Sequence, residues 1–180
     1  IQVLEENGIH IDCVAGTSMG AYVGACWCRG YDGRELERIA LTHRGRYGPW
    51  KLMDLAWPFC RGLIRGDKVE SSLRKEIGDV DFNELNRPLA VSATRVDNLE
   101  PTIFSCGDVA SAARASCSMP GICVPVERGG IEFMDGGMTD PLAIGALASL
   151  GAERIIACCA LRDPRHRRLK LGQKRIASPW

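Results

Sequence analysis

The sequence predicts an α/β domain in which a mostly parallel central sheet lies between two layers of helices. Segments with strand character alternate along the chain with segments of helical character. Several strand segments, such as residues 11–15 and 154–161, are almost entirely apolar, which is typical of strands covered on both faces. The chain has 180 residues, enough for one hydrophobic core. These observations favour a three-layer αβα fold.

Six helices are predicted where apolar residues with helical spacing follow a capping residue or end at a glycine. They cover residues 1–7, 19–29, 33–43, 68–77, 109–118 and 141–149. The Asp-x-x-Glu spacing of a capping box at Asp32 and at Asp67 opens the third and fourth helices. Asp108 is expected to cap the fifth, and Asp140 with Pro141 to open the sixth.

Five strands are predicted between these helices. They cover residues 11–15, 87–95, 101–105, 131–134 and 154–161. The second and third are expected to form a hairpin around Asp97 and Asn98. The segment 47–65 is predicted to be irregular and rich in large apolar groups, including Trp50 and Trp57.

Charge is distributed unevenly along the chain, although the formal net charge is only +1. Residues 162–175 carry seven Lys and Arg residues against Asp163 alone. We therefore divide the chain into a domain over residues 1–161 and a basic tail over residues 162–180. The tail is interpreted as solvated or as the start of a truncated helix, and the alternative is attraction to anionic lipid headgroups. Nucleic acid is not expected as a partner, because no aromatic residues interleave with these charges.

The chain has nine cysteines, an odd number, and no two of them form a C-x-x-C pair. None of the three histidines has zinc-type spacing to a cysteine. We expect reduced thiols in a cytoplasmic protein, with no disulfide framework, metal or organic cofactor. No run approaches the roughly 18 apolar residues of a membrane-spanning helix, and no secretory signal opens the chain. Oligomeric state is not indicated by the sequence.

The candidate nucleophile is Ser18, in the sequence Gly16-Thr17-Ser18-Met19-Gly20. The pattern alone is weak, but here it follows a predicted apolar strand and precedes a predicted helix. A strand, sharp turn and helix with serine at the apex form a nucleophile elbow, which exposes the hydroxyl near the positive end of the helix. We expect both glycines of the motif to be required because a side chain at either would clash across the bend.

The candidate base is Asp135, which ends the apolar strand Ile-Glu-Phe-Met and precedes Gly136 and Gly137. Strand ends of a parallel sheet gather at one edge, where sites are built. An aspartate before glycine is also an ordinary turn signal. The three histidines are weaker candidates for the base. His10 lies before the elbow strand, His43 at a charged helix end and His166 in the basic tail, and none ends a strand. A carboxylate can take the serine proton directly.

These residues carry a resemblance to a known family. The stretch Gly-Thr-Ser-Met-Gly after Ile-Asp-Cys-Val-Ala, together with Phe-Met-Asp-Gly-Gly downstream, resembles the patatin-like phospholipases, most of all the bacterial branch related to neuropathy target esterase. Further similar stretches surround both motifs and extend the resemblance over most of residues 1–161. The resemblance implies a patatin-like fold, Ser18 as nucleophile and Asp135 as the base of a dyad. It implies hydrolysis of acyl esters in phospholipids or lysophospholipids without a cofactor, with peripheral contact at the inner face of the membrane.

The chain departs from the family pattern at its start. Family members carry a glycine-rich loop with a basic residue ahead of the elbow, which supplies oxyanion donors. We expect that this loop lies outside the chain, which would then be a truncated domain in which the backbone N–H of Met19 contributes one donor. Loss of a donor costs about 10²–10³ in turnover. The alternatives left open are an inactive domain with a scaffold role, acyl transfer from the same acyl-serine, and a histidine triad.

Overall fold

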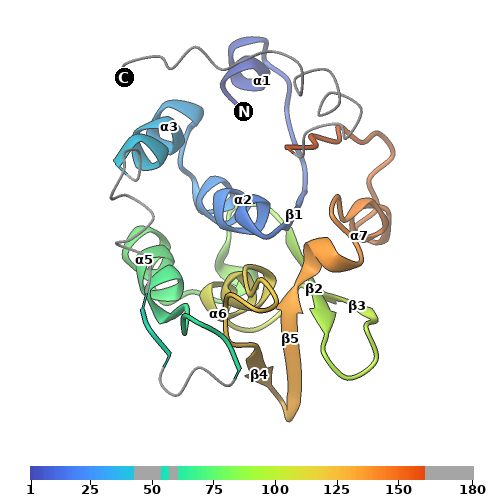
Figure 1. The fold of residues 1–180 in the computed structure, drawn as a ribbon. Coiled ribbons are helices and arrows are strands. Elements are labelled where there is room, and N and C mark those ends of the chain that lie inside the picture. The colour runs from blue at the N-terminus through green and yellow to red at the C-terminus, as the bar shows by residue number, and fades with distance from the viewer. Residues whose placement is uncertain (43–53, 57–60, 161–180) are drawn as a thin grey trace, which may run out of the picture.

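The structure is a computed structural model that describes residues 1–42, 54–56 and 61–160. Its α-helices, labelled as in Figure 1, are α1 (Gln2–Glu6), α2 (Met19–Arg29), α3 (Gly33–Thr42), α5 (Asp67–Ile77), α6 (Val109–Ser116) and α7 (Ile144–Ser149). Two short 3₁₀ helices are η1 (Phe82–Glu84) and η2 (Gly136–Met138). The strands are β1 (Val14–Thr17), β2 (Leu89–Arg95), β3 (Pro101–Phe104), β4 (Val126–Arg128) and β5 (Ile131–Asp135).

The strand β2 is the centre of the sheet, and its pairings explain where the site forms. On one edge it pairs with β3 in the predicted antiparallel hairpin. Along the other edge, β1 pairs in parallel with the first half of β2, and β5 pairs antiparallel with the second half. The register places Thr17 opposite Ser92 and Asp135 opposite Ala93. The ends of β1 and β5 therefore meet head to head at the middle of β2.

The sheet is mixed rather than mostly parallel, so that part of the prediction is wrong. In the described part of the chain, β1 with β2 is the one parallel pair of strands, whereas β2 with β3, β2 with β5, and β4 with β5 are antiparallel. The β2–β3 and β4–β5 pairs are hairpins whose strands are joined by short turns, and β5 also enters the sheet antiparallel to β2. A strand that follows its partner through a short turn must run antiparallel to it.

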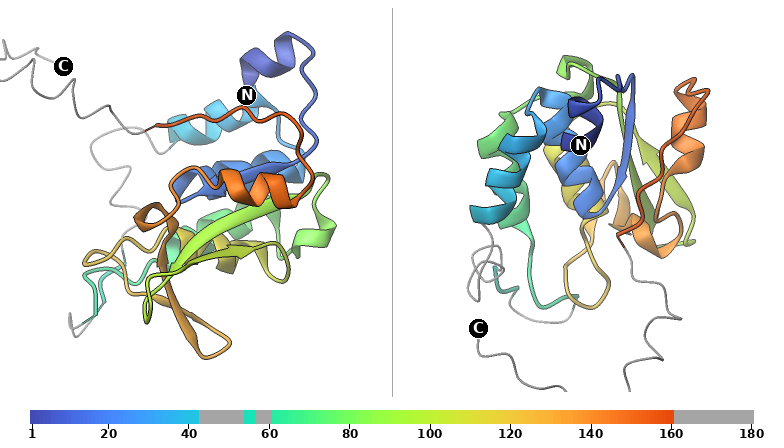
Figure 2. Two further views of the ribbon diagram at one scale, coloured as in Figure 1. Left: turned by 90° about the vertical axis from the view of Figure 1, so that its right-hand side faces the viewer. Right: turned by 90° about the horizontal axis from the view of Figure 1, so that it is seen from above.

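Helices cover both faces of the sheet, which confirms the three layers. On one face, α2, α5 and α6 enclose the main core, which includes the fully buried Leu73, Val91 and Val109. On the other face α7 packs through Ala143 and Ala146 against Ala90. Figure 2 shows α7 on one side of the strands and α2, α3 and α5 on the opposite side. The small residues of α2 and α6 let both helices approach the sheet closely.

Local capping signals explain the starts of α3 and α6. The capping box at Asp32 is present, since its carboxylate accepts the Glu35 N–H at 2.8 Å. Asp108 caps α6 as predicted, accepting from the Ser111 N–H. The expected box at Asp67 is wrong, because Gly66 occupies the N-cap with a left-handed φ of 84°. The carboxylate of Asp54 instead accepts the first amides of α5, an arrangement between segments that a local pattern does not reveal.

Two C-terminal expectations also differ from the structure. Asp140 accepts the Ala143 N–H at 2.8 Å, and Ala143 is left-handed, so α7 begins at Ile144 rather than at residue 141. The predicted strand 154–161 is not formed over residues 154–160, where Ile156 is 62% exposed. A strand is stabilised by pairing, and this segment pairs with no other strand in the described ranges. Trp50, Trp57 and the basic tail lie outside the described residues.

Candidate active site

Ser18 lies at the sharp turn between β1 and α2, as the motif predicts. Its backbone has φ 56° and ψ −124°, which is a strained conformation for a residue with a side chain. Gly16 is required by the turn, because a Cβ there would lie 2.4 Å from the Gly20 carbonyl oxygen. The expectation for Gly20 itself is wrong, since a Cβ on Gly20 would meet nothing within 4 Å. Steric crowding therefore requires glycine at position 16 of the motif but not at position 20.

The backbone of Ser18 is held by the end of α6, which packs on the same face of the sheet as α2. Its N–H donates to the Oγ of Ser116 at 2.7 Å, and that hydroxyl donates to the Ser92 carbonyl at 2.6 Å. Ser116 is fully buried at the end of α6. The preceding Thr17 donates its hydroxyl to the Asp140 carbonyl at 3.0 Å. Both faces of the sheet thus contribute a bond to the elbow.

Asp135 is the last residue of β5 and is only 7% exposed. Its N–H donates to the Ser118 carbonyl at 2.8 Å, and its Oδ1 accepts the Gly137 N–H at 2.8 Å. Gly136 fits where no other residue does, because a Cβ there would lie 2.2 Å from the Ser92 carbonyl oxygen. The carboxylate is therefore fixed by backbone contacts on both sides.

The structure brings the two predicted residues into direct contact. The Oγ of Ser18 donates a hydrogen bond to Oδ2 of Asp135 at 2.7 Å. Their separation of 117 residues along the chain is bridged by the head-to-head meeting of β1 and β5. His10 is exposed and contacts Asp12, and His43 and His166 lie outside the described residues. In the described ranges, no histidine contacts Ser18.

A half-buried thiol, that of Cys117, adjoins the pair. Burial raises the pKa of Cys117 to about 12, and the nearby negative charge of Asp135 adds to this, while contact with the Ser18 side chain opposes it. Cys117 is therefore a neutral, apolar neighbour at physiological pH. No disulfide joins cysteines within the described residues, and Cys60 lies outside them.

Three exposed methionines lie close to the site along the chain. Met19, Met119 and Met138 directly follow Ser18, Ser118 and the Asp135 turn, and they are 58%, 50% and 60% exposed. The Met19 N–H is at the first position of α2 and has no acceptor among the described residues. A donor near the nucleophile and flexible apolar side chains around it suit an ester with an apolar acyl group.

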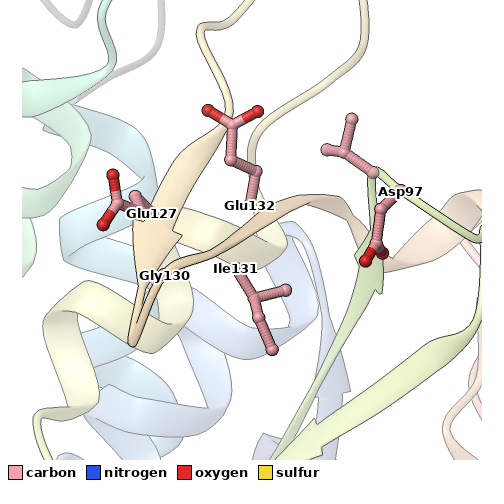
Figure 3. Close-up of a pocket in the computed structure, with 6 residues that line it drawn as sticks. Asp97, Glu127, Gly130, Ile131 and Glu132 are labelled. Carbon is pink, nitrogen blue, oxygen red and sulfur yellow. The ribbon is translucent and has the colours of Figure 1, made fainter.

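A hollow of about 480 Å³ lies at the other end of β5, about 13 Å along the strand from Asp135. Asp97, Glu127 and Glu132 line it, and Figure 3 shows their carboxylates pointing in different directions. Glu132 pairs instead with Arg61. In the part of the chain that the structure describes, no group of three or more His, Cys, Asp or Glu residues is placed to hold a metal ion.

Sequence reasoning missed Ser116, Ser118 and Ser92. Each acts on the site through a contact with a residue distant in sequence, so no local pattern marks it. The available signal was the run of small polar residues Ser116-Cys117-Ser118, which begins at the last residue of the alanine-rich helix α6. Buried hydroxyls in such a place need partners, which points to a structural or site contact.

Comparisons with known proteins show which family the chain resembles. The sequence model of the patatin-like phospholipase family matches residues 1–148. The chain is 31% identical over 159 residues to "Lysophospholipase nte1" of Aspergillus fumigatus, covering 87% of this chain and 10% of that protein. It is 29% identical to "Lysophospholipase NTE1" of Saccharomyces cerevisiae, covering 87% of this chain and 9% of that protein. The chain thus spans about a tenth of the length of these relatives.

Among solved structures, VipD from Legionella pneumophila aligns with a TM-score of 0.58 and 15% identity, covering 76% of this chain and 42% of that chain. This likeness concerns the fold. No helix in the described ranges is long and apolar enough to cross a membrane. The extent of the family match and the similarity to the two lysophospholipases lead to one conclusion: the chain belongs to the patatin-like phospholipase family.

Proposed function

We propose that this chain carries the hydrolytic site of a lipid acyl hydrolase that cleaves carboxylic esters of phospholipids or lysophospholipids through an acyl-serine intermediate. The observation that carries the proposal is the 2.7 Å hydrogen bond from Ser18 to Asp135 at a strained elbow. We assign the activity to residues 1–161. The names of the similar proteins support a lysophospholipid or phospholipid as substrate.

The proposed first step transfers the acyl group to the enzyme. Ser18 Oγ attacks the ester carbonyl while Asp135 takes its proton, and Asp135 then passes that proton to the departing alcohol. In the second step water attacks the acyl-serine, Asp135 takes a proton from the water, and that proton returns to Ser18 as the acid leaves. No imidazole is needed, because the carboxylate already accepts the serine hydroxyl.

The developing oxyanion needs hydrogen-bond donors, and only a backbone N–H that is not already bonded can serve. The Ser18 N–H is already bonded to Ser116, so it does not serve. The Met19 N–H lacks an acceptor among the described residues and lies at the positive end of the 11-residue helix α2. We propose Met19 N–H as one oxyanion donor, with further donors supplied by the glycine-rich loop that the family resemblance implies.

The acyl chain is proposed to contact the exposed methionines beside the pair. Met19, Met119 and Met138 present unbranched, adaptable side chains that suit acyl chains of different shape. Their exposure also supports peripheral contact of this edge with a lipid surface. Because lipid substrates are taken from such a surface, these exposed methionines would help the site to reach its substrate.

The test replaces each member of the pair in the complete gene product. Ser18→Ala and Asp135→Asn should each lower the hydrolysis of a short-chain nitrophenyl ester at least about 10³-fold, since each removes a group that moves the proton. Ser18→Ala should also abolish labelling by a fluorophosphonate probe. Asp140→Asn, the same chemical change five residues later, should keep the activity because asparagine also accepts the capping bond.

The alternatives predict other results. Wild-type rates from either substitution would reject the pair. A wild-type protein without hydrolysis or labelling would favour a scaffold role. Release of acylated alcohol instead of free fatty acid, when an alcohol is added, would favour acyl transfer from the same intermediate.

A further inference from the structure

We propose that Ser116 is the positioning residue of the nucleophile: its hydroxyl holds the Ser18 backbone in the strained turn that directs Oγ at Asp135. This inference rests on the proposed function, because it concerns the reaction of that site. It adds a residue that neither motif contains and that lies 98 residues from Ser18 in the sequence.

The hydrogen bonds at Ser116 have a fixed direction. The Ser18 N–H can only donate and the Ser92 carbonyl can only accept. The hydroxyl proton of Ser116 therefore lies toward Ser92, at 2.6 Å, and a lone pair faces Ser18, at 2.7 Å. Both functions of the hydroxyl are used, and the side chain is fully buried. The hydroxyl is thus a bridge between the elbow and the middle of β2.

The Ser18 backbone needs such a bridge. With φ 56° and ψ −124° it occupies a region that non-glycine residues avoid, and such a conformation persists only where its surroundings impose it. Removal of the acceptor leaves the Ser18 amide without a partner and lets the turn relax. A rotation of this peptide carries Oγ away from Asp135, and a displacement of 1 Å can cost about 100-fold in rate.

The same end of α6 also fixes the base. The carbonyl of Ser118, two residues after Ser116, accepts the Asp135 N–H at 2.8 Å. The buried guanidinium of Arg114 donates to the Ser118 hydroxyl and to the Val124 carbonyl, which holds this end of the helix in place. Both members of the pair are therefore hydrogen-bonded to residues 116–118, Ser18 through the Ser116 side chain and Asp135 through the Ser118 backbone.

The experiment compares Ser116→Ala with Ser72→Ala in the complete gene product. Ser72 is half-buried on α5, and its hydroxyl contacts the Tyr22 hydroxyl at 3.1 Å, so Ser72→Ala makes the same chemical change away from Ser18. Ser116→Ala should lower kcat and the rate of fluorophosphonate labelling by about 10- to 100-fold, with KM within twofold of wild type. Ser72→Ala should leave both rates within twofold, whatever its effect on Tm.

Ser116→Cys provides a graded variant. A thiol is a weaker donor and acceptor than a hydroxyl, so its kcat should lie between those of alanine and serine at this position. It also decides the case in which Ser116→Ala fails to fold. A folded Ser116→Cys with wild-type kcat would overturn the inference, as would a Ser116→Ala kcat within twofold of wild type. A loss of kcat equal to that in Ser72→Ala would do the same. If wild type neither hydrolyses the ester nor is labelled, it is the proposed function that fails.

Discussion

The two turns that present the reacting groups are built in opposite ways. At the elbow, Ser18 has a left-handed φ of 56° and depends on the side chain of Ser116. At the aspartate turn, Asp135 has an ordinary φ of −51° and is held by backbone groups of Ser118 and Gly137. The serine is thus strained and tied by one removable hydroxyl, whereas the carboxylate is unstrained and fixed by the main chain. Side-chain changes should affect the elbow, and only changes that disturb the backbone should affect the aspartate turn.

The largest expected effect is at Gly136. The substitution Gly136→Ala places a Cβ 2.2 Å from the Ser92 carbonyl oxygen, and a backbone atom in the centre of the sheet cannot move aside. We expect a loss of several kcal/mol in the free energy of unfolding, measured by denaturant titration. Gly145→Ala in α7, where a Cβ meets nothing within 4 Å, is the control and should stabilise the fold by up to about 1 kcal/mol. A stable Gly136→Ala protein would show that the aspartate turn is not fixed by its backbone.

A second effect concerns the thiol between the two anchors. Because burial raises the pKa of Cys117 to about 12, its thiolate fraction should rise about tenfold for each pH unit, with no plateau below about pH 12. Alkylation by iodoacetamide, followed by mass spectrometry between pH 7 and 10, should show this slope at Cys117. The exposed Cys106 serves as the control for reagent access and should react first. Rapid alkylation of Cys117 at pH 7.5 would contradict the raised pKa of this thiol.

The smallest expected effect separates the two glycines of the elbow. Gly20→Ala adds a Cβ to an exposed helical position with open space around it. Since alanine favours the helix over glycine, the free energy of unfolding should rise by about 0.5–1 kcal/mol, seen as a higher Tm. Gly16→Ala should instead lower Tm, because its Cβ would lie 2.4 Å from the Gly20 carbonyl oxygen. Equal losses for both substitutions would mean that the elbow is tighter than its contacts indicate.

The sequence was most informative about helix and strand ends that are set by residues close along the chain. Helix α2 has the predicted bounds of residues 19–29, because the serine turn and Gly30 delimit it locally. The hairpin of β2 and β3 and the caps at Asp32 and Asp108 are confirmed for the same reason. These features depend on contacts between residues close along the chain.

What the sequence did not predict depends on distant partners. The direction of β5 in the sheet depends on its pairing with β2, and the start of α5 depends on the carboxylate of Asp54. For the candidate site, the motifs pointed to Ser18 and Asp135, whose catalytic roles remain predictions. Ser116 could not be assigned a role from its neighbours in the sequence, because its hydroxyl contacts Ser18 and Ser92, which are distant along the chain.

The head-to-head meeting of β1 and β5 has a consequence for assembly. The two strands share a neighbour but no pairing with each other, so only the alignment of each on β2 brings alcohol and acid together. A slip of β5 by one residue would turn Asp135 to the opposite side of the sheet and shift it by about 3.4 Å. Measured activity would therefore report the register of β5, since a molecule with a shifted strand could be compact and still be inactive.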